Sequence, residues 1–148
     1  MFDRGHSGTD GPPGVRDVCR MLDELDLRYM TDETHGAILL SFRGEAADYD
    51  IYILVRQEQA VVYIAIANYL KVPADHENID KILRRLMELN WEMSLGKAEW
   101  DASDGEVRLS YTFTTEDGLG TQALGVVLGY LVAAADRHHD ALARLVAA

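Results

Sequence analysis

The fold is decided by residues 49–67, which read YDIYILVRQEQAVVYIAIA. Residues 49–56 alternate with a period of two, residues 60–67 are apolar throughout, and the short polar turn at residues 57–59 joins the two runs. Short connections between such runs are typical of neighbouring antiparallel strands. The stretch therefore predicts the centre of an antiparallel sheet, with strands at residues 49–56 and 60–67.

The same stretch is apolar on both faces of this predicted sheet. Ile51 and Ile53 point to one face, and the opposite face carries Tyr52, Leu54, Val61, Tyr63 and Ala65. An antiparallel sheet with helices on one side normally has a polar second face. Two interpretations remain open: a further helix covers this face and forms a three-layer core, or the face is an exposed interface for a subunit or partner.

The flanking sequence supplies three helices and three more strands. Apolar residues recur at helical spacing in residues 14–27, in a second segment that begins with Asp75 as its N-cap and ends near Asn90, and from Thr121 onward. The remaining strands are expected at residues 37–43, 91–100 and 106–114, the last two as a hairpin. This order, α-β-β-β-α-β-β-α, predicts an α+β fold with helices packed on an antiparallel sheet.

The N-terminal residues differ in composition from the rest. Residues 1–13 are rich in Gly, Pro and polar side chains, which predicts a flexible tail outside the fold. The remaining length suits one domain, so residues 14–148 are expected to form a single unit.

The charge balance limits the classes of partner. The chain has 25 acidic and 14 basic residues and a formal net charge of -11, and its bases are scattered along the sequence, which disfavours direct binding of nucleic acid. The acidity is explained by solubility or by attraction to a basic protein partner. No apolar run is long enough to span a membrane. The single cysteine, Cys19, suits a reducing compartment, so we expect a cytoplasmic protein.

Residues for catalysis, metal binding or cofactor binding do not form a recognisable pattern. The sequence has no nucleophile elbow, phosphate loop or dinucleotide fingerprint, and no pair of His or Cys at metal-ligand spacing. The acids Asp101, Asp104 and Glu106 surround a predicted hairpin turn and are interpreted as solvated. We therefore expect no enzymatic activity, no metal and no cofactor.

Aromatic residues complete the set of candidate contacts. Trp91 and Trp100 flank the predicted hairpin, and each is equally compatible with the core and with an interface. The side chains expected to bind a protein partner are therefore Tyr52, Leu54, Val61, Tyr63, Trp91 and Trp100. The alternative function is that of a small-molecule sensor, with a pocket between the sheet and the last helix near Trp100, Tyr111 and Tyr130.

The C-terminal half also resembles a known family. Residues 90–101, 104–108, Tyr111 and 115–119 resemble the bacterial YbjN-domain proteins, and the resemblance spans residues 14–146. The resemblance implies the fold of class I type III secretion chaperones, which has the element order predicted above, and a dimeric state. It also implies a regulatory or chaperone-like role. Our hypothesis is that the dimer binds a client protein, with the last helix or the hairpin as the dimer surface.

Overall fold

The computed structural model describes residues 7–148 and is built around one six-stranded antiparallel sheet. The strand order across the sheet is β2-β3-β4-β5-β7-β6, and all neighbouring pairs are antiparallel. The strands are β2 (Met30–Asp32), β3 (Ala37–Arg43), β4 (Asp48–Arg56), β5 (Val61–Lys71), β6 (Lys97–Trp100) and β7 (Glu106–Thr114). The stretch at residues 49–67 lies at its centre, as predicted.

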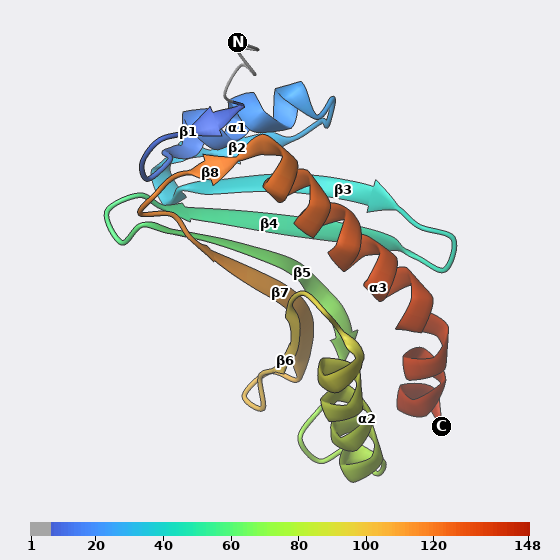
Figure 1. The fold of residues 1–148 in the computed structure, drawn as a ribbon. Helices are drawn as coiled ribbons and strands as arrows, with labels where there is room; N and C mark the ends of the chain where they lie inside the picture. The colour runs from blue at the N-terminus through green and yellow to red at the C-terminus, as the bar shows by residue number, and fades with distance from the viewer. Residues whose placement is uncertain (1–6) are drawn as a thin grey trace.

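Three α-helices accompany the sheet: α1 (Val15–Glu24), α2 (Ile79–Glu92) and α3 (Thr121–Ala147), with a short 3-10 turn, η1 (Glu33–His35), between β2 and β3. Figure 1 shows α3 running diagonally across the sheet, with α1 near its N-terminal end and α2 near its C-terminal end. The predicted α+β order is confirmed, since α1, β3, β4, β5, α2, β6, β7 and α3 follow one another as expected.

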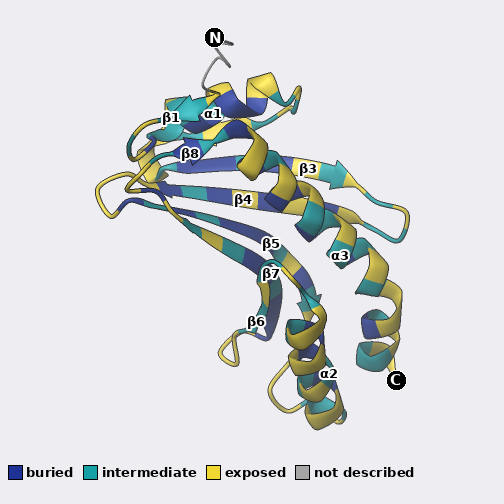
Figure 2. Cartoon of the chain, viewed as in Figure 1, coloured by how far each residue is buried: buried dark blue, intermediate teal, exposed yellow. Residues whose placement is uncertain are grey.

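The core lies between the helices and one face of the sheet, which we call the inner face. Ile38, Ile53 and Ile64 are directly paired across β3, β4 and β5, and all three are fully buried. Residues of all three helices belong to the same hydrophobic cluster. In Figure 2, buried residues follow the strands and the sheet-facing side of α3. Leu124, Leu128 and Leu131 provide that side because they recur at helical spacing.

Polar bonds fix the C-terminal half of α3 on the sheet. The carboxylate of Asp136 accepts hydrogen bonds from the backbone N–H groups of Glu45 and Ala46 and from the hydroxyl of Tyr49. Tyr69 donates a hydrogen bond of 2.6 Å to the carbonyl of Ala135. These bonds hold the loop between β3 and β4 and the end of β5 against the helix.

The expected tail lies partly inside the fold. Gly8 and Thr9 form β1 (Gly8–Thr9), which pairs with β8 (Leu119–Gly120) just before α3, so the interpretation of residues 1–13 as a free tail is wrong for these two residues. Two-residue strands carry no periodicity that a sequence can reveal. The first six residues of that predicted tail lie outside the described residues.

The incoming strand of the hairpin is shorter than predicted. Residues 79–92 form α2, so Trp91 lies in the last helical turn and only Lys97–Trp100 form β6. The stripe of Leu86 and Leu89 continues the helical pattern up to this point. Asn78, rather than Asp75, is the N-cap of α2.

Among residues 7–148, no helix is both long enough and apolar enough to cross a lipid bilayer.

Candidate functional site

Four of the six side chains expected to bind a partner share the face of the sheet opposite the core. Tyr52 is paired with Leu39 of β3, and Leu54 is paired with Tyr63 of β5. Directly paired residues point to the same side of a sheet. We call this side the outer face, and its main apolar members are Met30, Leu39, Tyr52, Leu54, Val61 and Tyr63.

Within the described chain, no helix packs on the apolar part of the outer face. None of these six side chains belongs to the hydrophobic core or to the partly buried set around it. Met30 is 71% exposed and Tyr52 is 36% exposed. The three-layer interpretation is therefore wrong for a single chain, because all three helices pack with the inner-face core. The outer face presents apolar side chains to solvent.

The outer face has an apolar half and a polar half. The apolar half lies over β2, β3 and β4, where a shallow hollow is lined by Met30, Leu39 and Tyr52 together with Asp50. Met30 and Leu39 were missed by the sequence reasoning. Leu39 could have been found because it alternates with the inner-face residues of its strand, whereas Met30 lies in a three-residue strand with no periodic signal.

The polar half lies over β5, β7 and β6. The hydroxyls of Tyr63 and Ser110 both donate hydrogen bonds to the carboxylate of Glu99. One carboxylate oxygen of Glu106 accepts from Arg108, and the other accepts from the backbone N–H of Asn68. Tyr63 is thus part of a polar network, whereas Tyr52 makes no side-chain hydrogen bond within residues 7–148 and Leu54 is apolar.

Glu106 is ionised in this network although its side chain is only 8% exposed. Burial alone would raise its pKa, but the hydrogen bonds from Arg108 and Asn68 outweigh burial and hold the pKa below its ordinary value of 4.5. The bond to Asn68 stabilises an irregularity in β5, because Asn68 has φ 51° and the pairing with β7 shifts between Ile66 and Leu70.

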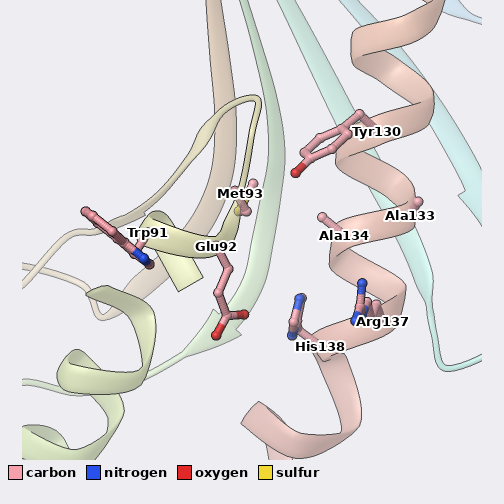
Figure 3. A pocket seen from close by; sticks show the side chains of 8 residues that line it. All are labelled: Trp91, Glu92, Met93, Tyr130, Ala133, Ala134, Arg137 and His138. Carbon is pink, nitrogen blue, oxygen red and sulfur yellow. The ribbon is translucent and has the colours of Figure 1, made fainter. Parts of the chain in front are cut away.

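A second candidate surface lies between the end of α2 and the middle of α3. The α2–α3 hollow encloses about 560 Å³ and is lined by Trp91, Glu92, Met93, Tyr130, Ala133, Ala134, Arg137 and His138. In Figure 3, the hydroxyl of Tyr130 points across the gap from α3, while Trp91 lies at the far edge on α2. The backbone N–H of Ser94 donates a 2.7 Å hydrogen bond to the Tyr130 hydroxyl, which ties the segment after α2 to α3.

At the α2–α3 hollow, Glu92 forms an ion pair and burial disfavours the charged form of His138. Arg85 binds Glu92 at 3.0 Å and lowers the pKa of that carboxyl. Burial lowers the pKa of His138 below its ordinary 6.5, and the nearby Arg85 acts in the same direction. His138 is therefore a neutral group at pH 7.

The pocket expected near Trp100, Tyr111 and Tyr130 does not bring these residues together. Of these three residues, only Tyr130 lines the α2–α3 hollow. Trp100 packs against the core, and its indole N–H donates a 2.9 Å hydrogen bond to the carbonyl of Val72. Tyr111 also packs against the core, edge-on to Phe113 with ring centroids 4.8 Å apart.

The structure offers no grouping of metal ligands in the part of the chain that it describes. No set of three or more His, Cys, Asp or Glu side chains is arranged to hold a metal ion there. In the hairpin turn, the Asp101 carboxylate accepts hydrogen bonds from the backbone and hydroxyl of Ser103, which lower its pKa. This carboxylate stabilises the turn.

Comparisons with known proteins agree with this fold. A family model, YbjN, described as "Putative bacterial sensory transduction regulator", matches residues 15–144. The chain is similar to the crystal structure of E. coli YbjN, described as a putative transcription regulator, with TM-score 0.68 and 11% identity over 89% of this chain and 96% of that chain. It is also similar to the crystal structure of the ExsC-ExsE complex, with TM-score 0.62 and 18% identity over 86% of this chain and 95% of the other. No curated protein sequence gives a significant match.

Proposed function

The chain belongs to the YbjN family, and from that premise we propose that it is a non-enzymatic protein-binding module, chaperone-like or regulatory. It acts as a homodimer and holds a partner protein on the apolar half of its outer face. The contacts are Tyr52 and Leu54, extended by Leu39 and Met30 on one side and, across the boundary with the polar half, by Val61 and Tyr63 of β5 on the other.

The observation that carries this proposal is the uncovered outer face of the central strands. Most of the described apolar side chains belong to the single core. Strands β2, β3, β4 and β5 nevertheless all contribute apolar side chains to a face on which no described helix packs. A soluble protein that exposes a contiguous apolar surface rimmed by polar groups typically uses it for binding. The tyrosines suit this use, since their large rigid rings bury much area at small entropic cost.

The surroundings of the outer face indicate the chemistry of the partner. One acidic and one basic residue, Asp50 and Arg28, line the apolar hollow, while the chain as a whole has a net charge of -11. A segment with apolar anchors and flanking Lys or Arg residues would be attracted by this net charge. The partner is accordingly a basic protein segment. The proposal includes a cytoplasmic location, in keeping with the single cysteine.

The similarity to ExsC supports protein binding without identifying the partner. ExsC was crystallised in complex with ExsE, and its fold covers most of this chain. At 18% identity the likeness concerns the fold alone, so the surface used by this chain has to be tested on its own residues.

The test is site-specific photo-cross-linking in cells that naturally carry the chain. A photoreactive phenylalanine replaces Tyr52 on the outer face and, as a control, Arg16, whose side chain is 88% exposed on α1. We expect one reproducible adduct with a second protein at position 52 and none at position 16. The adduct at position 52 should be lost when the same chain also carries Leu54→Asp and remains folded. If position 52 gives no more adduct than position 16, the outer face is not the partner site.

A further inference from the structure

The middle of α3 presents one of its sides to the α2–α3 hollow. Tyr130, Ala134 and His138 recur every four residues, so their side chains follow one another along the same side of the helix. In Figure 3 these three side chains face the hollow, with the small Ala134 between the two rings. Met93 lies across from them, just after the end of α2. The hollow therefore has an apolar middle between polar groups.

The walls of the hollow are fixed within the chain itself. The 2.7 Å hydrogen bond from the backbone of Ser94 to the Tyr130 hydroxyl ties the segment after α2 to α3. Two residues further on, Gly96 packs so closely on Leu131 of α3 that an added Cβ would lie 2.9 Å from that side chain. The volume of about 560 Å³ is within the range of small-molecule sites. A ligand of that size would enter with little rearrangement of the chain.

One positive charge at the hollow has no counter-ion in contact with it. The Arg137 side chain lines the hollow and forms no ion pair or hydrogen bond with any of residues 7–148. On the opposite wall, both carboxylate oxygens of Glu92 are bound by Arg85, at 3.0 and 3.5 Å. His138 is neutral at pH 7, and its ring nitrogens have no hydrogen-bond partner within the described chain. An unpaired guanidinium beside an imidazole N–H suits the binding of a small anion.

The charge at the hollow favours a carboxylate over a phosphate. Arg137 offers a single positive charge, and its planar fork matches the two oxygens of a carboxylate. A phosphate monoester carries about -1.5 to -2 at pH 7, so it would bring unmatched negative charge to a chain whose net charge is already -11. The apolar middle of the hollow requires that the acid also has an apolar body.

We propose that the α2–α3 hollow is a binding site for a small monocarboxylic acid with an aromatic or hydrocarbon body. The carboxylate accepts hydrogen bonds from Arg137 and from the ring N–H of His138. The body lies over Ala134, between Met93 and the ring of Tyr130. This activity goes beyond the proposed binding of a protein on the outer face. Since α2 and α3 pack on the inner face, the acid and the protein partner do not compete for the same surface.

The test is an NMR titration of the full chain with three fragments that share one aromatic ring. Phenylacetate is the probe, phenylacetamide removes its charge, and benzyl phosphate increases it. The ring resonances of His138, assigned with the variant His138→Gln, report on the hollow. Phenylacetate should shift them saturably with a dissociation constant on the order of 1 mM, as expected for a fragment of about ten non-hydrogen atoms. The amide and the phosphate should each bind at least about tenfold more weakly.

Substitutions at Arg137 locate the carboxylate. Arg137→Gln should weaken the binding of phenylacetate at least about tenfold, and Arg137→Lys should restore part of the loss because the positive charge is kept. Arg137 is exposed, so neither change disturbs the core. The matched control is Arg144→Gln, in the last turn of the same helix and outside the hollow, which should bind phenylacetate like the parent.

Three results would overturn the inference. The first is the absence of a saturable shift at His138 up to about 20 mM phenylacetate, roughly twentyfold above the expected dissociation constant. The second is equal affinity for the acid and the amide, a comparison that uses only the parent chain and so does not depend on the folding of a variant. The third is tighter binding of benzyl phosphate than of phenylacetate. Because the cross-link at position 52 is formed on the outer face, the proposed function and this inference can fail separately.

Discussion

Replacing Glu106 by Gln tests the polar half of the outer face. Both oxygens of this carboxylate are acceptors, one from the backbone N–H of Asn68 at 2.9 Å and the other from Arg108. Glutamine has the same shape, but one of its two terminal groups is an NH₂ donor. In either orientation of the amide, an N–H group faces another donor. The variant therefore loses one hydrogen bond and the charge that strengthens the other.

The expected cost follows from burial and charge. A hydrogen bond to a charged group contributes about 1.5–3 kcal/mol. The Glu106 side chain is 8% exposed, but that of Arg108 is 37% exposed, so solvent weakens this half of the network. We expect a loss of about 2 kcal/mol in the free energy of unfolding. For a chain of this length, that loss lowers Tm by about 4–8 °C.

The measurement is urea unfolding followed by circular dichroism at pH 7, with Glu58→Gln in the exposed turn after β4 as the matched control. The control should change the free energy of unfolding by less than about 0.5 kcal/mol. The difference between parent and Glu106→Gln should also depend on pH. Because the folded pKa of Glu106 is held below 4.5, its stabilising contribution is complete above pH 4.5 and is lost as the pH falls through the folded value. If Glu106→Gln is as stable as the control, or if its deficit is the same at acidic and neutral pH, the reasoning is refuted.

Three further predictions concern the fold. Gly96→Ala should lower the free energy of unfolding by at least about 1 kcal/mol in the same assay, because Gly96 has φ 82° and an added Cβ would lie 2.7 Å from the carbonyl oxygen of Ser110. The control is Gly129→Ala, which should be neutral or slightly stabilising because an added Cβ there would meet open space. Ile64→Ala, at a fully buried position, should cost about 2–5 kcal/mol, and an equal loss for Val126→Ala would contradict the assigned core. Asp136→Asn should destabilise the chain at neutral pH but much less in acid. Hydrogen bonds from Ala46 and Tyr49 hold the pKa of Asp136 below 3.8, so the contribution of this carboxylate to stability disappears as the pH falls through that lowered value. Urea midpoints that fall in parallel for parent and variant as the pH is lowered would exclude this role.

Periodic segments of the sequence were sufficient to predict the main elements. The strands at residues 37–43 and 106–114 and the start of the last helix at Thr121 have the bounds that the alternation of apolar residues predicts. Here local pattern and tertiary environment agree, because one side of each element faces the core. The two-residue strands β1 and β8 and the three-residue β2 are too short to show any period, so only long-range pairing reveals them.

Trp91 shows why the end of α2 was misplaced. Trp is common in strands, and Trp91 and Trp100 lie at the two ends of the segment predicted as the incoming strand of the hairpin. The helix nevertheless continues to Glu92, where Glu92 pairs with Arg85 of the same helix. Since α2 continues, the indole points into solvent instead of into the sheet.

The outer face shows a different limit of sequence reasoning. Alternation correctly predicted that Tyr52, Leu54 and Tyr63 share one side of the sheet. It could not show whether a helix covers that side, because the answer depends on where three separate helices pack. Their placement on the inner face follows from the whole core, to which Leu22, Leu89 and Leu131 contribute from different helices.

The order of the elements has a consequence for protein synthesis. The ribosome makes α3 after every described strand of the sheet, so the inner face remains without its principal cover until α3 has left the exit tunnel. During that interval both faces of the nascent sheet expose apolar side chains. A stalled or truncated product lacking α3 would therefore be a substrate for chaperones and proteases, and synthesis of α3 is a condition for folding of the sheet.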